Sequence, residues 1–91
     1  MTTIVYKKNE ISISGHAGNP IVCHGISAIS QMAANYLEDN RLGSVYCGDG
    51  HLRMWDIDEV TMNSSLFKAM KAALEDIQYD NSNNVKIIYE I

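Results

Sequence analysis

The spacing of apolar residues changes between residues 14 and 22, and this change constrains the fold more than any other feature. Before it, in the run EISIS, apolar and polar residues alternate, so Ile11 and Ile13 lie on one side of an extended chain. After it, apolar residues recur every three or four positions, the spacing of one helix face. The members of this stripe are Val22, Ile26, Ile29, Ala33, Tyr36 and Leu37. The chain therefore passes from a half-buried strand directly into a long amphipathic helix.

The flanking residues set the limits of these two elements. A short β-rich run at residues 4–6 precedes EISIS, and a turn through Lys8 and Asn9 joins the two as a hairpin. Pro20 stands where a proline can open a helix without losing a needed hydrogen bond. We expect the helix to begin within residues 21–24 and to end near Asn40, with Gly43 as the stop.

The second half of the chain repeats the strand and helix signals. The turn Gly48-Asp49-Gly50 separates two β-rich runs within residues 44–57, which predicts a second hairpin. A second helix follows, with Asn63 or Ser64 as its N-cap. Its apolar stripe is Leu66, Met70, Ala73, Leu74 and Ile77. Residues 85–91 form the last strand, whose one face carries Val85, Ile87, Tyr89 and Ile91.

The predicted order of elements is ββαββαβ. The economical packing of this order is an α+β two-layer sandwich, in which two helices cover one face of a mostly antiparallel sheet. The chain has 91 residues, so we expect one domain over residues 1–91.

Composition narrows the class of protein. The net charge of −4 argues against direct binding of nucleic acid, which requires a basic face. No apolar run approaches the roughly 20 residues of a membrane span. The opening residues MTTIVYKKNE lack the apolar core of a signal peptide, so we expect a cytoplasmic protein.

The most reactive side chains gather in the stretch SGHAGNPIVCHGIS, residues 14–27. We expect His16 at the end of the second strand and Cys23 in the first turn of the first helix. A helix N-terminus favours a thiolate over a thiol, and a nearby histidinium would add to that effect. Cys23 is therefore a candidate nucleophile and His16 a candidate base. The free N–H groups of the first helical turn are candidates for binding an oxyanion.

Each of these residues also has an ordinary structural interpretation. A single cysteine at a helix start is often a small buried apolar residue, and a single histidine often lies on the surface. Ser27, one turn beyond Cys23, is placed to support the thiolate, but it can equally bond a backbone carbonyl. His24 adjoins Cys23 and points about 100° away from it on a helix. These alternatives remain open from the residues alone.

Zinc binding is a weaker alternative. Cys47 and His51 flank the second hairpin turn, and with Cys23 and either His16 or His24 they provide four possible ligands. No C-x-x-C pair is present, and the spacing is unlike that of zinc fingers. We expect no metal and no other cofactor.

The segments GHAG and IVCHGISAIS resemble the signature of the ribosomal-processing cysteine protease family, Prp. In that family a Gly-His-Ala ends the second strand, and a loop leads to an Ile/Val-Val-Cys that opens the long helix. Residues 15–17 match the first part, residues 21–23 the second, and residues 25–27 the small residues and serine that follow. The predicted element order is similar to the family's fold.

The resemblance implies a cysteine endopeptidase with a Cys–His dyad, in which Cys23 is the nucleophile, His16 the base and Ser27 a supporting residue. It implies a peptide substrate: the N-terminal extension of a large-subunit ribosomal protein or, in phage and prophage relatives, a virion protein. It also implies a homodimer. The substrate loop would comprise Gly15, Ala17, Gly18, Asn19 and Pro20.

Two departures separate this sequence from the family pattern. The loop between His16 and Cys23 is shorter than usual, and Pro20 stands where the family has an acidic residue. His24 replaces a residue that is usually alanine. These changes are consistent with a phage or prophage member. They also keep open a catalytically inactive binding or assembly module that retains the fold.

Residues elsewhere have simpler interpretations. Trp55 and Met54 should lie on opposite faces of one strand, one in the core and the other available to a dimer contact. Asp56, Asp58 and Glu59 form a solvated acidic patch. Core filling is expected of Met32, Met62 and Met70.

Overall fold

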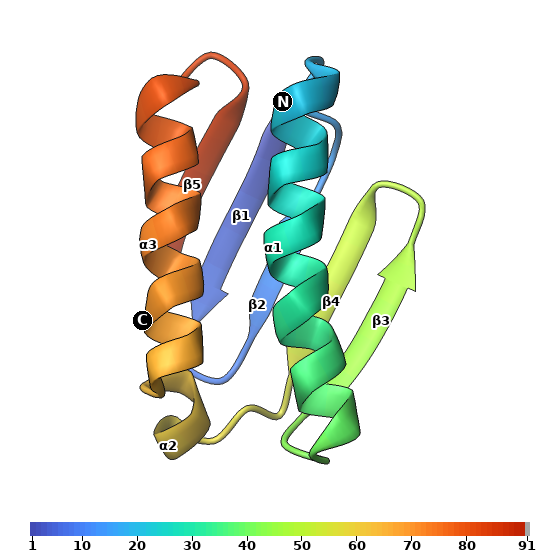
Figure 1. Cartoon of the computed structure of the whole chain (residues 1–91), viewed down its shortest axis with the longest axis vertical. Coiled ribbons are helices and arrows are strands. Elements are labelled where there is room, and N and C mark those ends of the chain that lie inside the picture. Colours follow the sequence, from blue (N-terminus) through green and yellow to red (C-terminus); the bar gives the residue numbers. More distant parts are fainter. Residues whose placement is uncertain (91) are drawn as a thin grey trace.

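The computed structural model describes residues 1–90 and has two layers, with the helices on one face of a five-stranded sheet (Figure 1). The prediction for Ile91 lies outside the described residues. The strands are β1 (Thr2–Lys7), β2 (Ile11–Ser14), β3 (Ser44–Gly48), β4 (His51–Trp55) and β5 (Val85–Glu90). The helices are α1 (Pro20–Asp39), α2 (Glu59–Met62) and α3 (Ser65–Asp80). The predicted α+β class and the order ββαββαβ are confirmed, with α2 as an addition.

The sheet has the strand order β3-β4-β2-β1-β5. Its pairs are antiparallel except that β1 and β5 run parallel. A strand that enters a sheet parallel to its neighbour cannot be reached by a tight turn and needs a long crossover connection. For β5 this connection runs from β4 through α3. The predicted, mostly antiparallel sheet is therefore confirmed.

The core lies between the sheet and the two long helices. Ile11 and Ile13 both point into it, as their alternation predicts. Leu37 of α1 and Leu74 of α3 are fully buried against the sheet. Fully buried side chains of this size each contribute roughly 1.5–3 kcal/mol through apolar burial.

Three positions in the helices differ from the predicted pattern. Tyr36 and Met32 on α1 are 39% and 51% exposed, so Tyr36 is at the edge of the stripe and Met32 does not fill the core. Phe67, which was not assigned to the α3 stripe, is only 2% exposed and is one of the largest buried side chains. Phe67 belongs to the buried face because that face of α3 also contains Met70 and Leu74, three and seven residues on.

The ends of α2 and α3 explain why the short helix α2 was not predicted. Ser64 caps α3 by accepting the N–H of Phe67, whereas Asn63 is the C-cap of the four-residue helix α2. Asp58 caps α2 by accepting the N–H of Thr61, and this hydrogen bond lowers the pKa of the Asp58 carboxyl. A helix of one turn has too few residues to show an apolar stripe.

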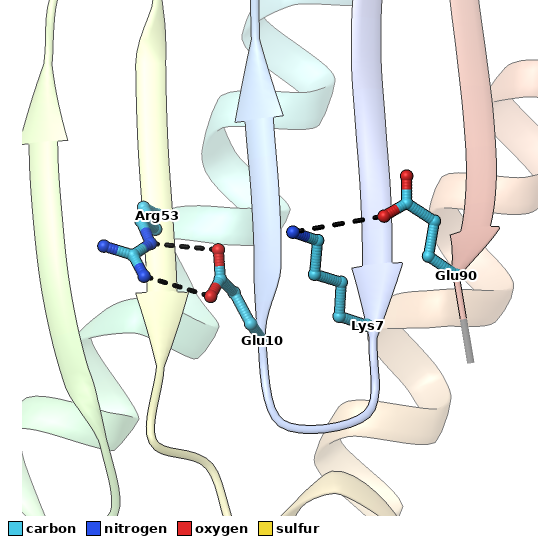
Figure 2. Close-up of polar contacts among 4 residues, drawn as sticks. All are labelled: Lys7, Glu10, Arg53 and Glu90. Carbon is cyan, nitrogen blue, oxygen red and sulfur yellow. Dashed lines mark hydrogen bonds and ion pairs between the residues drawn. The ribbon is translucent and has the colours of Figure 1, made fainter.

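The sheet face away from the helices carries two ion pairs (Figure 2). Arg53 donates to both carboxylate oxygens of Glu10, at 2.9 and 3.1 Å, and this pairing lowers the pKa of Glu10. The guanidinium also lies 4.4 Å from the ring centroid of Trp55. Met54 is fully buried on the other face, so the predicted opposition of Met54 and Trp55 is confirmed. Within residues 1–90, no helix combines the length and apolar character needed to cross a membrane.

Candidate active site

The loop between β2 and α1 turns the chain back toward the sheet. β2 ends at Ser14. His16 was predicted at the end of this strand, but it lies two residues beyond it. Gly15 and Gly18 have φ angles of 87° and 80°, the left-handed region that glycine tolerates best. α1 begins at Pro20, and Cys23 is its fourth residue. The loop therefore returns from the sheet edge to the helix start in very few residues.

A cavity of about 260 Å³ lies between α1 and the sheet at this end of the molecule. Its lining includes His16, Cys23 and Ser27, so the structure brings these three predicted residues together. Apolar side chains also line it, among them those of Ile13, Ile26 and Leu52. Figure 1 shows the start of α1 and the β3–β4 turn at the same end of the molecule. The cavity is thus a cleft with an apolar wall and a thiol on one side.

The sulfur of Cys23 has a specific backbone partner. The N–H of Ala17 donates to Sγ at a distance of 3.2 Å, and Cys23 itself is partly buried. The carbonyl of Ala17 accepts from the side-chain amide of Asn84 at 2.7 Å. Asn84 thus binds the residue whose N–H contacts the sulfur of Cys23, although Asn84 is distant in sequence.

The first turn of α1 differs from our expectation. The side-chain oxygen of Asn19 accepts the N–H groups of Ile21 and Val22, at 3.0 and 3.4 Å. The backbone carbonyl of Asn19 accepts the N–H of Cys23 at 3.0 Å. These N–H groups are therefore not free to bind an oxyanion, and that expectation is wrong. The reason is that Asn19 is the N-cap, a position at which asparagine is strongly preferred.

Neighbouring backbone fixes the position of His16. A Cβ atom built on Gly50 would lie 2.9 Å from Nε2 of His16, so the imidazole rests on the β3–β4 turn. The N–H of Gly15 donates to the carbonyl of Gly50 at 2.9 Å, and the nitrogen of Met1 donates to the carbonyl of His16 at 2.6 Å. The side chain of His16 is exposed and lines the cavity. The imidazole ring of His16 is thus held in a defined position and remains accessible to solvent.

The other candidate residues divide between the cavity and the surface. His24 is exposed and is not part of the cavity lining. Ser27 is exposed and lines the cavity, whereas the hydroxyl of Ser30, further along α1, is buried and donates to the carbonyl of Ile26 at 2.6 Å. Cys47 and His51 line the cavity with Cys23. Among residues 1–90, no three or more His, Cys, Asp or Glu side chains are grouped so as to hold a metal ion.

Comparison with known proteins decides the family. A family model described as cysteine protease Prp matches residues 1–86. The chain belongs to the cysteine protease Prp family. This membership confirms both the resemblance and the enzyme class, a cysteine protease. No curated protein matches the chain.

Solved structures with the same fold include those of a Prp protease. The ribosomal processing protease Prp of S. aureus, with a covalently linked product peptide, has a TM-score of 0.82 and 21% identity, and the match covers 99% of this chain and 100% of that one. The same protease with a substrate peptide gives 0.81 and 20%, with the same coverage. The SMU.848 protein of Streptococcus mutans gives 0.63 and 24% identity, over 98% of this chain and 93% of that one. At these low sequence identities, the similarity shows that the proteins share a fold and carries no further conclusion.

Asn84→Ala tests the hydrogen bond that holds the Prp loop. We expect the rate of Cys23 alkylation at pH 7 to fall about three- to tenfold, because one hydrogen bond of roughly 0.5–1.5 kcal/mol no longer positions Ala17. Asn83→Ala, at an exposed neighbouring position, is the matched control. A loss of thermal stability with an unchanged alkylation rate would show that Asn84 is structural only.

Proposed function

We propose that this chain is a cysteine endopeptidase in which Cys23 is the nucleophile and His16 the general base. One observation supports this most: the sulfur of Cys23 accepts a backbone hydrogen bond from Ala17 inside the cavity that His16 also lines. A thiol with a polar partner, an open cleft and a nearby imidazole fits nucleophilic chemistry better than core packing.

The first half of the reaction forms a thioester. Sγ of Cys23 attacks the carbonyl carbon of the scissile peptide, and His16 holds the proton that the thiol gives up. The carbonyl oxygen becomes an oxyanion. When the C–N bond breaks, the imidazolium of His16 gives this proton to the leaving amine. The acyl group of the substrate then remains on Cys23.

The second half releases the acyl group. A water molecule attacks the thioester carbon while His16 accepts one of its protons. The C–S bond breaks, the proton returns to sulfur, and the product leaves as a carboxylic acid. The N–H of Ala17 is the backbone donor seen at this sulfur, which attacks the substrate in the first half and is the leaving group in the second.

Ser27 and the loop have supporting roles in this proposal. Ser27 lines the cavity one helical turn beyond Cys23, where its hydroxyl can hydrogen-bond a substrate. The loop residues receive the peptide chain and hold His16. They are Gly15, Ala17, Gly18, Asn19 and Pro20.

The proposed substrate is the N-terminal extension of a ribosomal large-subunit protein or a related phage virion protein. The similar S. aureus protein is described as a ribosomal processing protease and was solved with peptides. Ribosomal substrates place the proposed activity in the cytoplasm.

We also propose that the chain acts as a homodimer. The sheet face that bears Arg53 and Glu10 in Figure 2 is uncovered by helices. The guanidinium of Arg53 lies over the ring of Trp55. Tyr46, which pairs with Arg53 across β3 and β4, is 54% exposed on the same face. Sedimentation at micromolar concentration should give twice the mass of one chain, and Trp55→Glu should give one chain.

An inactive binding module is the second candidate. The short loop favours it, since Pro20 occupies the first position of α1 and leaves little length between His16 and Cys23. Such a protein would bind a peptide in the same cavity without cleaving it.

The rate of Cys23 alkylation distinguishes the two candidates. In a Cys47→Ser background, iodoacetamide should modify Cys23 at pH 7 at least about tenfold faster than it modifies a free cysteine peptide, because only the thiolate reacts. Removing His16 should reduce this rate, whereas His24→Ala should not. A rate equal to that of the free peptide in all three proteins would support the binding module.

A further inference from the structure

A second pocket lies at the end of the molecule opposite Cys23. It has a volume of about 450 Å³ and is formed by the end of β1, α2 and the first turns of α3. In Figure 1 these elements meet at the lower end, whereas α1 starts at the upper end. The residues that line the pocket are Tyr6, Lys7, Lys8, Glu59, Met62, Asn63, Phe67, Lys68 and Lys71.

Positive charge is concentrated at this pocket. Four of the five lysines of the chain line it, and Glu59 is the one acidic residue among the lining residues. The whole chain has a net charge of −4, so the positive charge at this pocket is opposite in sign to that of the chain as a whole. Such a cluster attracts anions locally, and dissolved ions screen the attraction beyond about 10 Å at 0.1 M salt.

The charges of these lysines are only partly compensated within residues 1–90. Lys7 lies 4.0 Å from Glu90, the limit of an ion pair (Figure 2). Lys71 lies 5.0 Å from the ring centroid of Tyr89, whose hydroxyl donates to Glu75. In the described part of the chain, Lys8 and Lys68 make no ion pair. The pocket rim thus has cationic groups available to a ligand.

Tyr6 lines the pocket, and its hydroxyl, which has less than 1 Å² of exposed surface, comes within reach of a ligand only when neighbouring side chains shift. Tyr6 is only 6% exposed, and its hydroxyl has no hydrogen-bond partner among the described residues. Burial raises the pKa of Tyr6, so the group stays protonated and can donate. Leaving a buried donor unsatisfied costs about 1–3 kcal/mol. An acceptor brought by a ligand would recover that hydrogen bond.

Two of the other lining residues, Met62 and Phe67, are apolar. Phe67 is 2% exposed and Met62 is partly buried against the core. Methionine adapts its shape to different side chains and contacts aromatic rings favourably. A volume of this size accommodates one large side chain together with a short piece of backbone.

We propose that this pocket binds an acidic peptide segment of a partner protein, with a large apolar side chain against Met62 and Phe67 and flanking carboxylates on the lysines. The Tyr6 hydroxyl donates to the bound segment. The apolar wall favours a peptide over a nucleic acid, and so does the negative net charge of the chain. The site is remote from Cys23, so the proposal does not depend on peptidase activity.

Calorimetric titration with a defined probe tests this site. The probe is the blocked peptide Asp-Glu-Phe-Asp-Glu, and Asn-Gln-Phe-Asn-Gln is its neutral control. The acidic peptide should bind at least about tenfold more tightly than the neutral one, a difference of about 1.4 kcal/mol. Lys68→Glu combined with Lys71→Glu should remove that difference. Lys86→Glu, which makes the same change on β5 away from the pocket, should leave it intact.

Tyr6→Phe gives a second, independent readout. It should weaken binding of the acidic peptide a few-fold, while the free protein becomes no less stable, because an unsatisfied donor has been removed. Binding should persist in Cys23→Ala. Equal binding of the two peptides, an equal loss in Lys86→Glu, or tighter binding of inorganic phosphate or an oligonucleotide than of the acidic peptide would overturn the proposal.

Discussion

Cys23→Ala should abolish peptide cleavage and leave the fold intact. Loss of the nucleophile should lower the rate at least about a thousandfold, as it does in hydrolases in which nucleophile and base act as a unit. Alanine is the best helix former, and Cys23 is only partly buried, so α1 should form normally. Cleavage of a peptide library by the parent and the variant, followed by mass spectrometry, measures the effect.

His16→Ala should produce a loss of similar size, because His16 is the proposed base and lines the cavity together with Cys23. His24→Ala and Cys47→Ser are the matched controls, and each should retain most of the parent rate. Cleavage that survives in Cys23→Ala would disprove the proposed nucleophile. Thermal unfolding of every variant should show that the loss is chemical and not structural.

Most of the fold could be predicted because its signals are local. The alternation at Ile11 and Ile13 and the stripe from Val22 to Leu37 each predict a buried face, and both faces pack into the core except at Tyr36. The helix α2 was missed because one turn shows no periodicity. The parallel pairing of β1 and β5 was not predicted either, because pairing depends on contacts between distant segments.

The cavity could be predicted in part. His16, Cys23 and Ser27 belong to one short stretch, so their meeting follows from local chain reversal. The hydrogen bond from Ala17 to the sulfur could not be predicted, because it depends on backbone geometry. Asn84 lies 67 residues from Ala17, and nothing in the sequence connects the two.

The wrong expectation that the first N–H groups of α1 bind an oxyanion was avoidable from the sequence. An asparagine directly before a proline is a recognisable helix start, with Asn19 as the cap and Pro20 at the first position. A capping side chain occupies the first N–H groups of the helix. The same two residues that mark the start of α1 therefore also indicate that its N–H groups are not available to an oxyanion.

Gly15→Ala should be the most damaging glycine substitution in the loop. A side chain at a φ of 87° is strained, and the added Cβ would also overlap the backbone carbonyl oxygen of Met1. The strain alone costs about 1–2 kcal/mol, and the overlap with backbone raises the total to about 3 kcal/mol or more. A domain of this size has roughly 5–15 kcal/mol of stability in all. Urea unfolding measures the loss.

Gly18→Ala is the matched control for that prediction. Its φ of 80° imposes nearly the same strain, but the nearest atom to its new Cβ, in the Asn84 side chain, is 4.0 Å away. The control should therefore lose only about 1–2 kcal/mol. Gly15→Ala should also lower the alkylation rate of Cys23, because relief of the overlap moves the backbone that carries His16 and Ala17. Equal losses of stability in the two variants would mean that backbone strain alone, and not the contact with Met1, requires glycine at residue 15.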